Sequence, residues 1–171
     1  MKKIIKGLFA IVAVTVILTA CSSSKKASHV DPVEQTKVDN AQNEEDNRVE
    51  LLTFKRTSCY GRCPVYDLKI YADKTCEIDG KLFFIVEGKH DGELTQIQYD
   101  KIIKTINDIK YFTLNDVYDD RLVQDIAATF ITVTMNGKTK SIKSRYGSPK
   151  ELRDFLTAIH ELAKLVEWKK K

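Results

Sequence analysis

Val65-Tyr66-Asp67-Leu68-Lys69-Ile70-Tyr71-Ala72 alternates between apolar and charged residues, which is the two-residue period of a half-buried β-strand. The side chains of Tyr66, Leu68 and Ile70 fall on one face of this strand, and the charged side chains fall on the other. The stretch therefore predicts one strand of a sheet that buries a single face, and the neighbouring residues indicate how the sheet continues.

Further short strands are predicted on both sides of this stretch. They are separated by short polar dipeptides, each containing an acidic residue followed by Lys or Gly, and such dipeptides favour turns. The expected strands are Leu51 to Arg56, Thr75 to Ile78 after a tight turn at Asp73-Lys74, and Leu82 to Val86 as a buried strand, with breaks at Asp79-Gly80 and Glu87-Gly88.

Two amphipathic helices are predicted from a change to the helical period. Thr95-Gln96-Ile97-Gln98 has the pattern of a capping box, and Ser148-Pro149-Lys150-Glu151 predicts a second box with Pro at the first helical position. The apolar stripe of the first helix contains Tyr99, Ile102, Ile103, Ile106 and Ile109, and that of the second contains Leu152, Phe155, Leu156, Ile159, Ala163 and Val166.

Asn136-Gly137 is a strong hairpin signal between Ala128 to Met135 and Lys138 to Lys143, and it favours a type I′ turn. In that register Val133 faces Lys140, which suggests an edge strand protected by lysines. The order of strands, helix, hairpin and helix predicts an α+β fold. We expect an antiparallel β-sheet, a meander plus a C-terminal hairpin, with two helices packed on one face.

The N-terminal residues have the pattern of a bacterial lipoprotein signal. Three lysines lie within Met1 to Lys6, an apolar region follows from Leu8 to Ala20, and Cys21 stands where cleavage is expected. The sequence thus predicts a signal peptide at 1–20, lipidation of Cys21, a polar disordered tether at 21–48 and a single domain at 49–171. The expected location is the cell envelope, anchored to a bacterial membrane, which in a Gram-negative cell would be the outer membrane facing the periplasm.

The charge of the chain argues against nucleic-acid binding. The leader carries three lysines and no acid, so its removal lowers the net charge from +4 to +1. The remaining basic run, Lys169-Lys170-Lys171, is expected to be a frayed, solvated helix end, with contact to anionic headgroups as an alternative. Partners expected are therefore the membrane, through Cys21, and an envelope protein or cell-wall component.

Cys59-Tyr60-Gly61-Arg62-Cys63-Pro64 is the segment most suggestive of chemistry. One interpretation is a small disulfide loop, because the compartment outside the inner membrane is oxidising and Gly61 could supply a sharp bend. Another is a thiol pair for redox chemistry or copper binding, and a third is reduced thiols or pairing with Cys76. Cys76 is in phase with Ile78, so we expect a small buried core residue there.

Other candidate sites are weaker. His90 lies in a predicted loop and could be a ligand or an acid/base, although a surface role is more common for such a residue. Acidic residues between Asp116 and Asp125 lack calcium spacing and indicate a solvated loop with local Asx turns. No catalytic motif and no metal spacing appear in the sequence. We therefore predict no catalytic residue, no metal and no cofactor.

The segment from Arg56 to Tyr66, together with Ile70-Tyr71-Ala72-Asp73, resembles the bacterial domain-of-unknown-function 6438 family. Further similarity lies at Gly88-Lys89-His90, at Asn136-Gly137-Lys138, and at Tyr146 with Pro149, and the resemblance spans about residues 50–168. It differs at Lys74, where the family usually has Gly, and around Gln124-Asp125. The family implies no established activity.

The functional expectation is a non-enzymatic envelope lipoprotein that acts as a binding or structural module, with thiol-redox or copper binding through Cys59 and Cys63 as the alternative. Residues of the expected binding loop and its surroundings are Arg56, Tyr60, Gly61, Arg62, Pro64, Tyr66 and His90.

Overall fold

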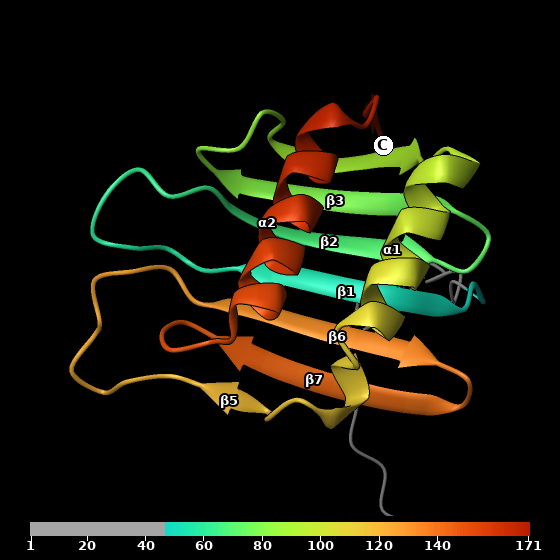
Figure 1. The fold of residues 1–171 in the computed structure, drawn as a ribbon. Coiled ribbons are helices and arrows are strands. Elements are labelled where there is room, and N and C mark those ends of the chain that lie inside the picture. The colour runs from blue at the N-terminus through green and yellow to red at the C-terminus, as the bar shows by residue number, and fades with distance from the viewer. Residues whose placement is uncertain (1–46) are drawn as a thin grey trace, which may run out of the picture. The chain divides into compact units, whose positions relative to one another are not determined.

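A computed structural model describes residues 47–171 as two layers, an eight-stranded sheet and two α-helices that both cover one face of it (Figure 1). The expected leader, Cys21 and all but the last two residues of the expected tether lie outside the described residues. The elements are β1 (Glu50–Arg56), β2 (Val65–Tyr71), β3 (Thr75–Leu82), β4 (Gly88–Glu93), α1 (Gln96–Asp108), a 3-10 turn (Tyr111–Thr113), β5 (Val117–Tyr118), β6 (Thr129–Met135), β7 (Lys138–Ser144), α2 (Lys150–Leu165) and β8 (Lys169–Lys170). Their order across the sheet is β5-β7-β6-β1-β2-β3-β4-β8, and every pairing except β5 with β7 is antiparallel. The α+β fold predicted from the sequence is confirmed.

The buried face of the sheet is built from cross-strand apolar pairs. Phe54 of β1 lies opposite Leu68 of β2 and Ile131 of β6, and Leu68 lies in turn opposite Ile78 of β3. All four side chains are buried beneath the two helices. The alternation predicted from Val65 to Ala72 is therefore confirmed, because its apolar residues face the helices.

The opposite face of the sheet is polar. Ion pairs join Lys81 to Asp67 and Lys69 to Glu50, and the Thr132 and Ser141 hydroxyls are 2.7 Å apart. Antiparallel sheets commonly bury one face and leave the other in water. The second layer of helices is thus the only cover that the described residues provide for the sheet.

The meander ends differently from the prediction. β3 continues through Asp79-Gly80, and Leu82 to Val86 form the end of β3 and the following loop instead of a buried strand. Phe83 in this loop has a φ of 53° and is 54% exposed. Residues Gly88–Glu93, expected as a loop, form β4 because their backbone pairs with β3, although they lack the apolar alternation that marks a strand.

The first helix begins as predicted. The backbone N–H of Gln98 donates to Thr95 Oγ1 at 3.2 Å, and the N–H of Thr95 donates to Gln98 Oε1 at 2.8 Å. This capping box satisfies two N–H groups that the helix itself cannot bond. Ile102 and Ile106 are buried against the sheet. Within residues 47–171, no helix is both long and apolar enough to cross a membrane.

The prediction of a capping box at the start of the second helix is wrong. Pro149, not Ser148, is the N-cap residue of α2, and no side chain caps this end. Ser148 is 4% exposed, and its Oγ lies 2.6 Å from Ser144 Oγ at the end of β7. The hydroxyl is therefore directed toward the sheet and away from the helix. The apolar face predicted for α2 is confirmed, with its six residues all buried.

The hairpin between β6 and β7 is confirmed in turn and register. Asn136 and Gly137 both have positive φ, 53° and 70°, as a type I′ turn requires. Val133 lies opposite Lys140, as predicted. These residues form regular strands because both the turn and the apolar pattern select the same register.

The edge position predicted for β7 is confirmed only in part, because β5, in a segment predicted to be loop, pairs with its last two residues, Lys143 and Ser144. The lysines of β7 instead pair with acidic residues around β5: Lys140 with Asp116, and Lys143 with Asp119 at 2.5 Å. Asp120 does form an Asx turn, accepting the N–H of Leu122 at 2.9 Å. The acidic segment is thus partly an ion-pairing partner for β7.

The C-terminal basic run is also different from the prediction. Helix α2 ends at Leu165, and Lys169–Lys170 form β8, which pairs with β4. The indole N–H of Trp168 donates to the Ala163 carbonyl at 2.8 Å, and Lys171 Nζ lies 2.7 Å from Glu77 Oε1. These contacts hold the last residues against the sheet, so they do not form a frayed helix end.

Replacement of Gly80 should destabilise the fold. A Cβ built at Gly80 would lie 1.9 Å from the Val86 carbonyl oxygen, so the backbone of the β3–β4 loop must move. We expect Gly80→Ala to lower the free energy of unfolding by about 1–3 kcal/mol, measured by urea denaturation. Gly61→Ala is the matched control, because its Cβ meets only Cys59 Sγ at 3.8 Å. Equal losses in the two variants would contradict this explanation.

Candidate functional site

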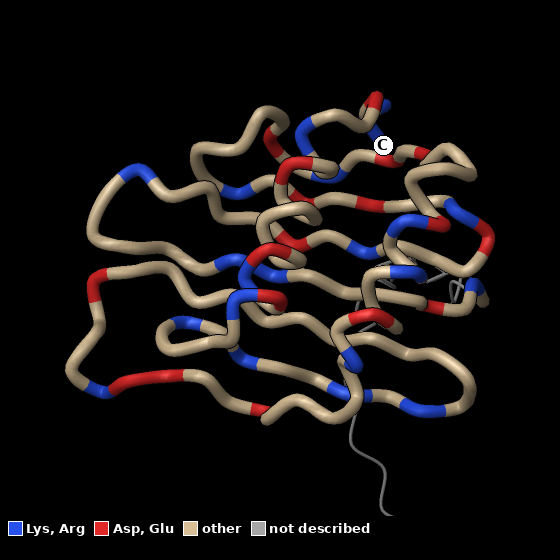
Figure 2. The backbone as a smooth tube through the Cα atoms, viewed as in Figure 1, with Lys and Arg blue, Asp and Glu red and all other residues tan. Residues whose placement is uncertain are grey.

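A polar pocket of about 370 Å³ lies at the loop end of the sheet, where β1 ends and β2 begins. In Figure 1 this end lies at the left, where the loops after β1, β3, β5 and β7 gather. Figure 2 shows basic segments in β1, in the β7–α2 loop and in the first turns of α2, and these segments line the same pocket. The polar and charged side chains of the polar pocket are Arg56, Thr129, Ser144, Arg145, Tyr146, Ser148, Arg153, Thr157 and His160.

Arg56 places a charged group on the buried face of the sheet. It is in phase with the buried Leu52 and Phe54 of β1, and its cross-strand neighbours are Tyr66 and Thr129. Its Nε atom is buried and has no hydrogen-bond partner among the described residues. Buried polar atoms without a partner are rare and costly, so a bound water or a ligand is expected to supply the missing partner of this atom.

His160 lines the polar pocket, and the buried Tyr66 lies behind it, opposite Arg56 on the neighbouring strand. Tyr66 is 0% exposed, its hydroxyl lies 2.8 Å from His160 Nδ1, and the Phe84 ring packs on it at 4.3 Å. Burial raises the pKa of Tyr66 well above its usual range. Burial, helped by the charges of Arg56 and Lys164, lowers the pKa of His160. Both rings are therefore neutral near pH 7 and joined by a hydrogen bond.

The other side of the polar pocket is held by the β7–α2 loop and α2. The Arg153 guanidinium donates to the Ser148 carbonyl, which fixes the start of the helix to this side chain. Arg145 makes two hydrogen bonds to the Asp119 carboxylate, and these, with Lys143, hold the pKa of Asp119 down at about 2. Arg145 thus has a counterion, whereas Arg56 and Arg153 form no ion pair within the described part of the chain.

The disulfide loop, residues 57–64, connects the two strands that contribute Arg56 and Tyr66. Cys59 and Cys63 form a disulfide with a Cα–Cα distance of 5.8 Å, in agreement with the first of the three interpretations of this segment. The N–H of Tyr60 donates to the Asp125 carbonyl at 3.0 Å, and the N–H of Thr57 donates to the Ala128 carbonyl at 3.0 Å. The loop is therefore attached to the β5–β6 loop as well as closed on itself.

Cys76 is separate from this disulfide. It is a free, buried thiol on β3, and desolvation raises its pKa to about 12. A thiol with so high a pKa is a poor nucleophile and a poor metal ligand at neutral pH. Its place in the hydrophobic core agrees with the phase predicted from Ile78.

The residues predicted for the binding loop lie in three different places. Arg56 lines the polar pocket, and Tyr66 is buried behind His160 and does not line it. At the loop tip, Tyr60 is 91% exposed, and the Arg62 guanidinium lies 5.6 Å from the centre of the Phe83 ring. Gly61 has no positive φ, so the bend does not require glycine, and Pro64 directly precedes β2. His90 is on β4, opposite Ile78, and does not line the polar pocket.

Sequence reasoning missed most of the polar pocket. His160, Arg145, Arg153 and the two serines come from segments far from Arg56 in the sequence. One signal was present: Arg56 follows the buried phase of β1, and an inward-facing charge at a strand end is unusual.

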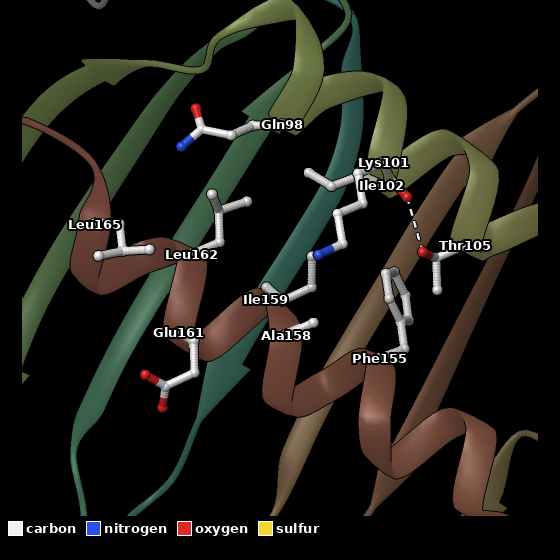
Figure 3. Close-up of a pocket in the computed structure, with 10 residues that line it drawn as sticks. All are labelled: Gln98, Lys101, Ile102, Thr105, Phe155, Ala158, Ile159, Glu161, Leu162 and Leu165. Carbon is white, nitrogen blue, oxygen red and sulfur yellow. Dashed lines mark hydrogen bonds between the residues drawn. The ribbon is translucent and has the colours of Figure 1, made fainter.

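A second hollow, of about 270 Å³, lies between the two helices (Figure 3). Side chains of α1 and α2 face one another across it, and the lining includes the buried Ile102, Phe155 and Ile159. Lys101 and Glu161 are its two charged lining residues.

From Asn47 to the C-terminus, no group of three or more His, Cys, Asp or Glu residues could hold a metal ion. The polar pocket is therefore the stronger candidate site.

Acidification should weaken the fold through His160. Because its folded pKa lies below the ordinary 6.5, the unfolded chain binds more protons, and stability is lost as pH falls from about 6.5 through the folded pKa. The groups that face the imidazole are Arg56, Tyr66, Lys164 and Glu161, of which only Glu161 opposes the shift. We expect His160→Asn to lose less stability than the wild type between about pH 7.5 and pH 5.5, by urea unfolding.

The matched control is His90→Asn, which removes a histidine outside the polar pocket and should keep the wild-type pH dependence. Parallel curves for the wild type and His160→Asn would contradict the assigned direction of the shift.

Loss of the disulfide should cost stability without unfolding the domain. The loop is short, with a sequence separation of 4, so the chain-entropy relation gives about 2 kcal/mol for its closure. We expect the free energy of unfolding of the Cys59→Ser/Cys63→Ser variant, measured by urea denaturation, to be lower than that of the wild type by this amount. Reductant should lower the free energy of unfolding of the wild type to the same value and leave that of the double variant unchanged. If the double variant had the same free energy of unfolding as the oxidised wild type, the disulfide would not restrict the unfolded chain.

The sequence of this domain matches a model of a known protein family. A family model described as Domain of unknown function (DUF6438) matches residues 50–163, which include β1 through most of α2. No curated protein matches the chain at a significant level. Because the family model covers most of the sequence, this chain belongs to the DUF6438 family.

Proposed function

We propose that this protein is a lipid-anchored, non-enzymatic binding module of the bacterial cell envelope, and that it binds its ligand in the polar pocket. The observation that carries the proposal is the buried Nε of Arg56, which has no partner among the described residues and lies in a pocket with other hydrogen-bond donors. Buried polar groups in folded proteins nearly always have a partner, and a ligand in the polar pocket would supply it for this atom.

The envelope location is supported by the sequence pattern of the leader and by the disulfide. Residues 1–20 have the pattern of a lipoprotein signal that ends before Cys21, and 21–48 have the composition of a tether. Disulfides persist in exported proteins and are rare in the reducing cytosol, so the Cys59–Cys63 bond favours the same compartment.

Binding is a better explanation than catalysis for the arrangement of the polar pocket. A serine nucleophile needs a general base within hydrogen-bond reach. In the polar pocket Ser144 and Ser148 bond to each other, and His160 Nδ1 is bonded to the Tyr66 hydroxyl. The imidazole is thus held as a hydrogen-bonding group and is not paired with a nucleophile.

The competing hypothesis is a thiol-redox or copper-binding module that uses Cys59 and Cys63. Both cysteines are partly exposed in the disulfide loop, where a reductant or a metal can reach them. A Cys59→Ser/Cys63→Ser variant separates the two proposals. If the cellular function survives in this variant, the binding module is favoured. If the function is lost while the fold stays intact, thiol chemistry is favoured.

The anchor is tested by acylation in bacterial cells. We expect the full chain to incorporate a palmitate analogue and to sediment with membranes, because Cys21 would carry the acyl chains. Cys21→Ser should lose the label, whereas Cys76→Ser should keep it as the matched control. Label that remains in Cys21→Ser would overturn the assignment of the anchor.

The binding surface is tested by photo-crosslinking in the same cells. A photoreactive residue at Thr157, exposed beside the polar pocket, should give a discrete adduct that weakens when Arg56→Gln is added. The same residue at the exposed Lys104 of α1 should give no such adduct. An adduct insensitive to Arg56→Gln, or none at Thr157, would contradict the proposal.

A further inference from the structure

We infer that the polar pocket binds a phosphoryl group, with Arg56 and Arg153 as its principal cationic contacts. This inference rests on the proposed function, since it names the ligand class of the same pocket.

The lining of the polar pocket has an excess of positive charge. It contains three arginines and no acidic residue. Arg145 is neutralised by Asp119, but Arg56 and Arg153 form no ion pair within residues 47–171. Two guanidinium groups without carboxylate partners attract an anion. The need for a partner is stronger at Arg56, because it is partly buried, and a partly buried charge is stable when it is paired and hydrogen-bonded.

The donors come from three different elements of the fold. Arg56 comes from β1, Arg153 and His160 come from α2, and Ser144 comes from the end of β7. A carboxylate is planar and is matched by a single guanidinium fork. Donors from three elements fit the tetrahedral oxygens of a phosphoryl group better. The N-terminal turn of α2 adds a positive partial charge on the same side.

The hydroxyl pair supplies one more donor. Ser144 and Ser148 are both buried, and their oxygens are 2.6 Å apart. Each hydroxyl has a single hydrogen, so whichever serine accepts in this pair keeps its own hydrogen for another acceptor. An anion in the pocket provides that acceptor.

His160 completes the donor set. When the Tyr66 hydroxyl donates to Nδ1, the neutral imidazole carries its proton on Nε2 and can donate through that atom. A bound anion also favours the protonated ring, which opposes the effects of burial, Arg56 and Lys164. The imidazole can therefore donate to the anion in its neutral form and, when protonated, also adds a positive charge.

The experiment measures binding to the full chain in non-ionic detergent, by titration calorimetry and by the shift of the unfolding midpoint. Inorganic phosphate is the first probe, with acetate and chloride at equal ionic strength as comparators. We expect saturable stabilisation by phosphate and weaker stabilisation by acetate, and an increase in Kd of about tenfold or more for Arg56→Gln. Arg153→Gln, at an exposed position, gives a second test that does not depend on burying a new side chain.

The matched control is Arg121→Gln, which removes an exposed arginine of the β5–β6 loop outside the polar pocket and should bind phosphate like the wild type. Glycerol phosphate and micelles that contain phosphatidylglycerol distinguish the sources of the group. If glycerol phosphate displaces inorganic phosphate, the ligand is assigned as a soluble phosphomonoester. If the phosphatidylglycerol micelles displace it, the ligand is assigned as a lipid headgroup.

No saturable binding of any phosphoryl probe, or equal affinities for wild type, Arg56→Gln and Arg153→Gln, would overturn the inference. That result is distinguishable from failure of the proposed function, because an Arg56-dependent adduct at Thr157 would still show a binding surface with a ligand of another class.

Discussion

The structure depends on one stripe of cross-strand contacts, in which Phe54 lies between Leu68 and Ile131 at the centre of the sheet. These side chains require cover, which the two helices supply, and the strands gain their fixed register from the same burial. The stripe also determines where polar chemistry can occur. At its loop end the apolar series stops, and Arg56, Tyr66 and Thr129 occupy the next positions on the same face. The polar pocket is therefore the continuation of the core into polar residues.

Elements with strong local signals were predictable from the sequence. The capping box at Thr95 and the Asn136-Gly137 turn are set by residues adjacent in the chain, so they could be identified without tertiary information. β4 and β8 were not predictable, because their residues carry no apolar alternation and form strands only through pairing with a neighbour. The prediction that Ser148 caps α2 was wrong for a related reason, since its hydroxyl bonds to that of Ser144 at the end of β7.

The candidate site was only partly accessible to sequence reasoning. Arg56 and Tyr66 were selected because they flank the cysteine segment, but the chain carries His160 about a hundred residues later and gives no local sign that it returns to Tyr66. Such a site requires topology: β6 lies beside β1, so the hairpin and α2 are brought back to the start of the domain. The disulfide loop joins the two strands at this point, which explains why a motif near the site was visible while the site itself was not.

The two outer strands, β5 and β8, are each two residues long. A sheet exposes unsatisfied backbone groups at its edges, and long, flat edges allow identical chains to join into fibres. Here β8 consists of lysines, and the part of β7 beyond β5 also carries lysine side chains. If many copies are concentrated on one membrane surface, as the proposed anchor implies, the short edge strands and the lysines of β8 would oppose edge-to-edge pairing of neighbouring molecules.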